Sequence, residues 1–270
     1  MKNLISHGFM MSLLLFACAC GQGEQPVERT SEQDTLNGPT ADADPRAREI
    51  AEQVVQACGG WDAWHKTRHI SWSFFGSRNW FWDKYTGDLR MAYPREDLLV
   101  LMNVNTEKGR AFIHHQEVTN ADTLAQILDL GRKRWVNDSY WLVMPFKLLD
   151  PGVRLEYKGQ DTTQDGRIAE TLQLTFFNEV GYTPENKYIV YVDTENNRLI
   201  QWDYFANTTM PEPSISDIWS DYKKYGGILL SSTRGDRNLN PIAVFDALPP
   251  QVYNDTASVA DLLTTNTILQ

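Results

Sequence analysis

Asp62, His65 and His69 are the best candidate in the sequence for a metal site. Residues three and four apart share one face of a helical turn, where two imidazoles and a carboxylate can hold a tetrahedral zinc ion. Tryptophans flank this turn, a strand pattern begins at Ile70, and no glutamate lies inside the turn to act as a base. We therefore expect no metal here, and we keep a hydrolase that uses this group as an alternative.

His114 and His115 are the only adjacent histidines. They end a segment, 109–115, that we expect to be a strand, where neighbouring side chains point to opposite faces. Two rings on opposite faces cannot converge on one ion, so we expect no metal at this pair either.

The familiar enzyme motifs are missing after residue 43. The sequence contains no Gly-x-Ser-x-Gly elbow, Walker loop, dinucleotide-binding glycine pattern or Cys-x-x-Cys pair there. Several carboxylates could still form a catalytic dyad, but we expect them to lie in turns and hairpins on a solvated acidic surface. They are Asp83, Asp138, Asp150, Asp203, Asp217 and Asp221. We predict no catalytic residue and no cofactor, and the alternative is a hydrolase that acts through these acidic residues.

Aromatic side chains, including nine tryptophans, are the most informative feature. Each buried ring removes about 150–250 Å² from water, so a set of them either packs a core or lines a hollow that a ligand fills. Pro145 interrupts an apolar helical segment, which could then part from a sheet as a lid. We predict that a hydrophobic ligand is bound by Trp72, Phe74, Trp80, Trp82, Trp141, Met144, Phe146 and Trp202.

Two helical segments are expected to position these rings. Asp44 and Pro45 match an N-cap and first helical residue, and apolar residues recur at helical spacing until Gly59-Gly60. Asn120 or Asp122 could cap the second segment, which reaches Asp150-Pro151-Gly152.

The rest of the body alternates with period two and predicts strands. They are expected near 68–76, 78–84, 88–93, 97–104, 109–115, 153–158, 167–177, 187–193, 198–206, 215–224, 227–234 and 241–246. So many consecutive hairpins must curl. The predicted fold is α+β: one curved antiparallel sheet of about eleven or twelve strands, an unclosed β-barrel, with helices filling its concave face.

The N-terminus has the pattern of a secreted lipoprotein. Lys2 precedes a short apolar run, and Leu15-Phe16-Ala17-Cys18 resembles a bacterial lipobox. We predict a signal peptide over 1–17 and lipidation of Cys18, with Cys20 as the alternative. Several acyl chains on one residue would anchor the chain to a membrane. No aspartate follows either cysteine, which favours the outer membrane, facing the periplasm.

Polar and acidic residues dominate the segment after the lipobox. They predict a disordered tether over 18–43, ahead of a folded domain over 44–270. The whole chain carries a formal charge of −10, which makes nucleic acid a poor partner.

Two stretches carry a resemblance to a known family. Gly59-Gly60-Trp61-Asp62-Ala63-Trp64, after an amphipathic helix, is one, and 137–148 followed by Asp150-Pro151-Gly152-Val153 is the other. They resemble periplasmic bacterial lipoproteins related to the lipoprotein-carrier fold of the LolA, LppX and RseB type. The resemblance covers most of 44–247 and implies an incomplete β-barrel, helices at its mouth and an apolar cavity for acyl chains. It assigns no individual binding residue.

These patterns together predict a lipid-anchored, non-enzymatic protein of the bacterial cell envelope. Its expected partner is a lipid or the acyl chain of a lipidated protein. Besides the hydrolase, a second alternative is an interaction protein whose cavity is packed shut.

Overall fold

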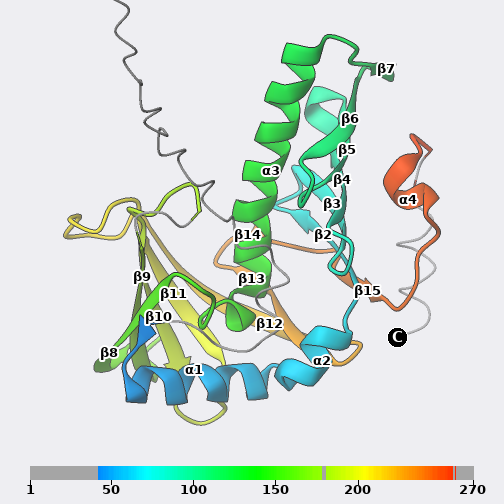
Figure 1. Ribbon diagram of the computed structural model, residues 1–270. Helices are drawn as coiled ribbons and strands as arrows, with labels where there is room; N and C mark the ends of the chain where they lie inside the picture. Colours follow the sequence, from blue (N-terminus) through cyan, green and yellow to red (C-terminus); the bar gives the residue numbers. More distant parts are fainter. Residues whose placement is uncertain (1–41, 178–180, 258, 260–270) are drawn as a thin grey trace, which may run out of the picture. The chain divides into compact units, whose positions relative to one another are not determined.

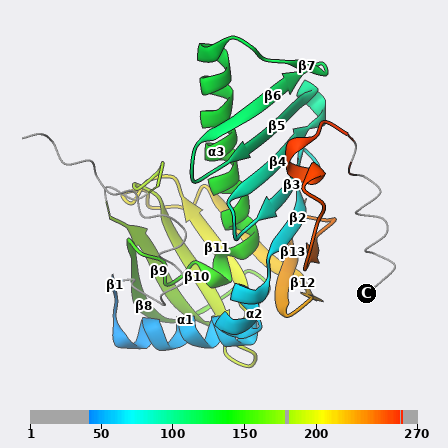
Figure 2. The same cartoon turned by 45° about the vertical axis from the view of Figure 1, so that its right-hand side comes forward.

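Two sheets, with helices between and beside them, make up the described part of the chain (Figures 1 and 2). The computed structural model describes residues 42–177, 181–257 and 259, which belong to one unit, 31–270. The predicted signal peptide, Cys18, Cys20 and nearly all of the predicted tether lie outside the described residues. The helices are α1 (Pro45–Ala57), α2 (Gly60–Lys66), the 3-10 turn η2 (Pro94–Glu96), α3 (Ala121–Val143), the 3-10 turn η3 (Met144–Phe146) and α4 (Gln251–Asn254).

The first sheet has eight strands in the order β1-β8-β9-β10-β11-β12-β13-β14. They are β1 (Asp42–Ala43), β8 (Val153–Thr162), β9 (Ile168–Phe176), β10 (Lys187–Asp193), β11 (Leu199–Phe205), β12 (Ile215–Tyr225), β13 (Ile228–Arg234) and β14 (Arg237–Asn238). The second sheet has seven, in the order β15-β2-β3-β4-β5-β6-β7. They are β15 (Ala243–Phe245), β2 (His69–Phe74), β3 (Arg78–Asp83), β4 (Asp88–Tyr93), β5 (Leu98–Asn103), β6 (Lys108–Ile113) and β7 (Gln116–Glu117). Every strand pair in the described residues is antiparallel except β1 with β8.

The expected single sheet of eleven or twelve strands is therefore wrong, although the class is α+β and neither sheet closes on itself in the described residues. The two sheets meet at Asn238 and Leu239. Asn238 O accepts a hydrogen bond from Phe75 N, just after β2, at 3.0 Å, and Leu239 O accepts one from Ser73 N of β2 at 3.1 Å. Leu239 N donates to Ser232 O on β13 at 2.8 Å. Pro241 follows, and it has no N–H to continue a ladder, so the chain leaves one sheet there and joins the other as β15.

Most predicted elements are confirmed. The twelve strands expected from the sequence correspond to β2–β6, β8–β13 and β15. Asp44 caps α1 by accepting a hydrogen bond from Ala47 N at 2.8 Å, and Asn120 caps α3 by accepting one from Thr123 N at 2.9 Å. The short helix α2 and three two-residue strands were not expected, because runs of so few residues show no periodicity.

α3 lies between the two sheets (Figure 1) and packs against β5 and β6 of one and β13 of the other. α1 packs against β8 across one end of the eight-stranded sheet (Figure 2). The inner faces of both sheets and the apolar sides of the helices form one buried cluster. α3 thus lies between two sheets and not on the concave face of a single one (Figure 1).

The junction between α1 and α2 needs glycine. Gly59 has a φ of +112°, and a Cβ there would lie 2.4 Å from Gly227 O, in the turn between β12 and β13. Leu229 N donates to Cys58 O at 2.9 Å beside this contact. These contacts fix the junction of α1 and α2 to the turn between β12 and β13.

Candidate functional site

The eight predicted ligand-binding side chains all lie in the one large core cluster. Each is buried, with at most 8% of its surface exposed. Trp141 on α3 touches rings of both sheets, with centroids 4.3 Å from Trp202 and 6.3 Å from Phe74. The structure therefore brings these residues together between α3 and the two sheets.

The other predicted rings extend this cluster toward α2 and η3. Trp72 and Trp80 stack at 5.7 Å on neighbouring strands. Phe146 of η3 stacks on Trp64 at 4.5 Å, and Trp64 meets Trp82 edge-on at 6.4 Å. Met144 is fully buried in the same cluster.

A buried carboxylate fixes α3 to the seven-stranded sheet. Asp138 is fully buried and accepts hydrogen bonds from Arg78 Nε at 2.7 Å, Arg78 Nη2 at 2.9 Å and Trp80 Nε1 at 2.9 Å. Burial raises the pKa of Asp138, while the Arg78 guanidinium acts to lower it. Asp138 belongs to α3 and Arg78 and Trp80 belong to β3, so these hydrogen bonds tie α3 to β3. Removing either charged partner would leave the other charge without its ion pair.

A buried guanidinium lies on the other side of α3. Arg234 on β13 has no exposed surface, and its Nη2 donates to Trp141 O at 2.7 Å. Its Nη1 donates to Ser231 O, Ser231 Oγ and Thr233 O, and its Cζ lies 3.2 Å from the centroid of Trp219. Burial lowers the pKa of Arg234 to about 9, so the group still carries its charge at neutral pH.

The core contains polar hydrogens that no described residue accepts. The indole N–H groups of Trp72, Trp82, Trp135, Trp202 and Trp219 have no hydrogen-bond partner among the described residues. Neither do the Tyr140 hydroxyl and the Arg234 Nε. Buried polar atoms in proteins are nearly always paired, so a cluster of unpaired donors calls for an explanation.

The metal group of the alternative hydrolase, Asp62, His65 and His69, does not assemble. His65 on α2 stacks on Trp61 at 5.8 Å between ring centroids, whereas His69 on β2 forms a 2.8 Å hydrogen bond through Nδ1 with the Tyr253 hydroxyl. Within the described ranges, no set of three His, Cys, Asp or Glu side chains could hold a metal ion. The hydrolase that would use Asp62, His65 and His69 therefore has no metal site in this part of the chain.

The expectation for His114 and His115 is wrong in its geometry. Strand β6 ends at Ile113, and both histidines occupy a tight turn with φ of 50° and 62°, as a type I′ hairpin requires. Their rings therefore do not point to opposite faces: His114 Nδ1 lies 3.1 Å and His115 Nε2 3.8 Å from the Asp97 carboxylate. All three side chains are exposed or half-exposed.

The carboxylates expected on a solvated surface are mostly buried. Asp83, Asp138, Asp203 and Asp217 expose at most 9% of their surface. Each is bonded: Asp203 to Tyr191, Gln201 and Ser216, and Asp217 to Arg237 at 2.8 Å. The prediction failed because partners distant in sequence supply the hydrogen bonds that let a carboxylate leave water.

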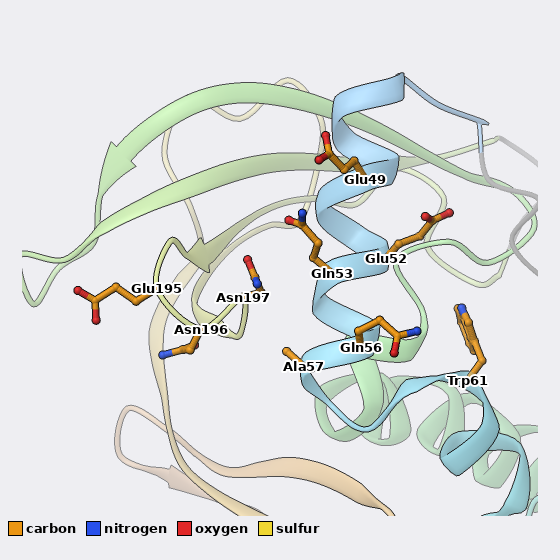
Figure 3. A pocket seen from close by; sticks show the side chains of 9 residues that line it. All are labelled: Glu49, Glu52, Gln53, Gln56, Ala57, Trp61, Glu195, Asn196 and Asn197. Carbon is orange, nitrogen blue, oxygen red and sulfur yellow. The ribbon is translucent and has the colours of Figure 1, made fainter.

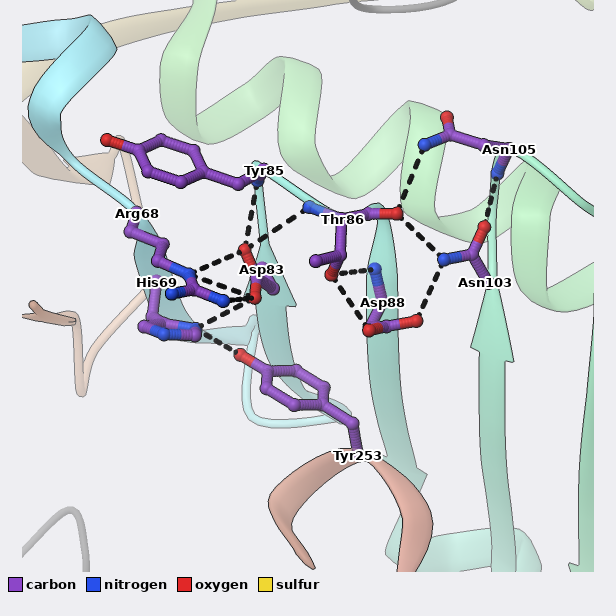
Figure 4. A network of polar contacts seen from close by, with 9 residues as sticks. All are labelled: Arg68, His69, Asp83, Tyr85, Thr86, Asp88, Asn103, Asn105 and Tyr253. Carbon is purple, nitrogen blue, oxygen red and sulfur yellow. Dashed lines mark hydrogen bonds and ion pairs between the residues drawn. The ribbon is translucent and has the colours of Figure 1, made fainter. Parts of the chain in front are cut away.

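Figure 4 shows how one of them, Asp83, joins a polar network on the outer face of the seven-stranded sheet. It accepts hydrogen bonds from Arg68 Nε and Nη2 and from Tyr85 N, and His69 nearby holds Tyr253 of α4. Burial lowers the pKa of His69, whereas the Asp83 charge acts to raise it. The network holds the C-terminal helix in place and is a structural link.

Arg90 on β4 secures the same segment a few residues further on. It exposes 5% of its surface and donates to the carbonyls of Val252, Asp255 and Ala257 at 3.2, 2.7 and 2.8 Å. Residues 252–257 thus form a strap across the outer face of that sheet.

A surface pocket of about 720 Å³ lies beside α1 (Figure 3). Carboxylates and amides dominate its lining: Glu49, Glu52, Gln53, Gln56, Glu195, Asn196 and Asn197, with Ala57 and Trp61. None of the eight predicted ligand-binding residues lines it.

Sequence reasoning missed Arg234 and the role of Asp138. Both left a signal in the sequence. Arg234 continues the strand face of Ile228 and Leu230, and Asp138 lies at helical spacing between Trp135 and Trp141. A charged residue on an apolar stripe is the pattern that could have identified them.

Solved structures resemble the chain at low sequence identity. No protein-family model matches the chain, and no curated protein matches it. It is similar to the solved structure of a DUF1329 family protein from Desulfovibrio piger ATCC 29098, with a TM-score of 0.42 and 11% identity over 80% of this chain and 99% of that chain. It is also similar to a domain named for outer membrane lipoprotein sorting, from Vibrio parahaemolyticus, with a TM-score of 0.38 and 10% identity over 83% of this chain and 99% of that chain.

The second of these structures is of the kind to which the resemblance in the sequence pointed. Both TM-scores are below 0.5.

Proposed function

We propose that this chain is a lipoprotein of the bacterial cell envelope that binds a hydrophobic ligand without transforming it. The ligand is a lipid or the acyl chain of a lipidated partner. The observation that carries the proposal is the aromatic cluster between α3 and the sheets, with its five indole N–H groups that no described residue accepts. A ligand with an apolar chain and oxygen atoms suits such an interior, because the chain is compatible with the rings and the oxygens can accept from the donors.

An acyl chain would gain free energy from every methylene that it buries among the predicted binding residues. Burying one methylene contributes about 0.8 kcal/mol, so even half of a long chain stabilises a complex by several kcal/mol. Entry of an acyl chain requires two packed surfaces of the protein to separate, because the rings are buried against one another. The separation must also leave the sheets intact.

The interface between α3 and the eight-stranded sheet is the proposed route, and its opening breaks the 2.7 Å hydrogen bond from Arg234 Nη2 to Trp141 O. α3 is tied to the seven-stranded sheet by Asp138 with Arg78 and Trp80. On its other side, Tyr140 meets Phe176 and Tyr188 through ring contacts at 6.3 and 5.6 Å, and its hydroxyl has no partner among the described residues. We propose that α3 and η3 act as the lid and that Trp141, Met144, Phe146 and Trp202 contact the ligand first. Trp72, Phe74, Trp80 and Trp82 lie on β2 and β3 of the seven-stranded sheet.

The membrane anchor belongs to the same proposal. None of the helices in the described residues is long and apolar enough to cross a membrane. Acyl chains on Cys18, or on Cys20, would hold the protein at the outer membrane with its body in the periplasm. Metabolic labelling with an alkyne-bearing palmitate tests this: Cys18→Ser should abolish the label and Cys20→Ser should retain it. The opposite result would identify Cys20, and label on both variants would contradict a single lipidation site.

Ligand binding is testable by tryptophan quenching. The full-length chain with Cys18→Ser and Cys20→Ser, termed the lipid-free variant, avoids interference from attached acyl chains. Titration with a monoacylglycerol of dibrominated stearic acid should quench its fluorescence to saturation, below the concentration at which the lipid forms micelles. The unbrominated lipid is the control, since it should bind without quenching. Quenching that never saturates would show that no chain enters the core.

A further inference from the structure

The most unusual charge in the described residues is Arg234, a guanidinium without exposed surface and without an ion pair in that part of the chain. Its Nη atoms donate to backbone carbonyls and one hydroxyl, which bring no formal charge to neutralise it. Uncompensated buried charges are costly, and proteins keep them chiefly where a partner or a ligand supplies the opposite charge.

The surroundings of Arg234 are built from its strand neighbours. Trp219 on β12 is its direct cross-strand partner, and Arg234 Cζ lies 3.2 Å from the centroid of that ring. Trp202 on β11 meets Trp219 at 5.4 Å. These three side chains therefore form one continuous patch on the inner face of the eight-stranded sheet, directly under Trp141 of α3.

Each member of this patch offers a donor that no described residue accepts: the Arg234 Nε and the indole N–H groups of Trp202 and Trp219. Asp217 is the carboxylate whose charge acts on Arg234, but it is itself bonded to Arg237 at 2.8 Å. Two guanidinium groups thus face one buried carboxylate, with Asp236 exposed in the turn beyond. The buried surroundings of Arg234 keep an excess of N–H donors, and the carboxylate nearest in charge is already shared with a second guanidinium.

We infer that the ligand is an acyl amphiphile with an oxyanion head, a carboxylate or a phosphate, and that Arg234, Trp202 and Trp219 form its head-group subsite. This inference rests on the proposed function, since it adds a head to the acyl chain. An oxyanion accepts several hydrogen bonds at once and also neutralises the guanidinium. A neutral ester accepts hydrogen bonds but does not neutralise the charge, and an ammonium head neither accepts hydrogen bonds nor neutralises it.

The test compares three lipids that share one dibrominated stearoyl chain: the free fatty acid, the lysophosphatidic acid and the neutral monoacylglycerol. Each is titrated into the lipid-free variant at neutral pH, with tryptophan quenching as the readout. The two anionic lipids should bind at least about tenfold more tightly than the glyceride, because hydrogen bonds between charged groups are stronger than neutral ones. The difference between the acid and the phosphate then shows which oxyanion the subsite prefers.

Two variants locate the preference. Arg234→Gln should nearly abolish the preference, measured as the ratio of anionic-lipid affinity to glyceride affinity, and the control Arg154→Gln, half-exposed on β8 of the same sheet, should keep it. If Arg234→Gln does not fold, Trp219→Phe removes one donor but keeps a ring and should weaken binding of the anionic lipids more than binding of the glyceride.

The outcomes separate the two proposals. No saturable quenching by any lipid would overturn both the proposed function and the subsite. Equal affinity for all three lipids, or an anion preference that Arg234→Gln preserves, would overturn the subsite alone and leave the acyl site standing.

Discussion

Replacing Asp138 with alanine should be among the most destabilising single changes in the body. The substitution removes the acceptor of two hydrogen bonds from Arg78, at 2.7 and 2.9 Å, and of one from Trp80, at 2.9 Å. Breaking a buried ion pair by removing one partner costs roughly 3–5 kcal/mol. The Arg78 side chain is 15% exposed and can regain some water, so we expect the lower end of that range, about 3 kcal/mol.

Calorimetry and urea unfolding of the lipid-free variant can measure this. For a body of this size, about 3 kcal/mol corresponds to a fall in Tm of roughly 6–12 °C. Asp129→Ala is the control on the same helix: its ion pair with Lys133 is half-exposed, so no measurable change is expected.

A double-mutant cycle with Arg78→Met should show a coupling energy of about 2 kcal/mol. An Asp138→Ala variant within about 1 kcal/mol of the parent would refute the anchor, because ordinary surface changes cause no more than that. Additive single changes would show that the two residues do not act as a pair.

Three further outcomes follow from buried groups. Burial lowers the pKa of His69, so as the pH falls the unfolded chain takes up a proton at this residue before the folded chain does. The Tm should therefore fall as the pH drops below 6.5, and His69→Asn should reduce that pH dependence. A pH dependence of Tm that His69→Asn leaves unchanged would contradict this. Cys58 is fully buried with a pKa raised to about 12, so iodoacetamide should label the lipid-free variant only after unfolding, and rapid native labelling would disprove its burial. Arg90→Met removes three hydrogen bonds to the strap, so hydrogen exchange should increase in 251–257 and stay unchanged in α1; equal increases in both would indicate global destabilisation instead.

Local chemistry made most elements predictable. Ile70, Trp72 and Phe74 alternate with serines and so predict β2, and Asp44 with Pro45 predicts the start of α1. The division into two sheets was not predictable in this way. The division depends on which strands, far apart in the sequence, pair with one another. It also depends on Pro241, which from the sequence alone is equally compatible with a simple turn.

The candidate site was predictable in part. The apolar pattern places the eight aromatic and Met residues inside, and they do share one cluster. It cannot show that Arg234 reaches the carbonyl of Trp141, 93 positions earlier, or that Asp138 meets Arg78, 60 positions earlier. Hydrogen bonds between such distant residues decide whether a charge on an apolar face stays buried.

The parallel pairing at the start of the body has a mechanical consequence. Asp42 and Ala43 lie alongside Arg154 and Leu155 of β8, and Asp44 is bonded both to Leu155 O and to Tyr157 N. A force pulling on the N-terminal end along the strand axis would load these hydrogen bonds together, in shear, rather than one after another. Tension from that end would therefore be borne by the edge of the eight-stranded sheet before it reached α3.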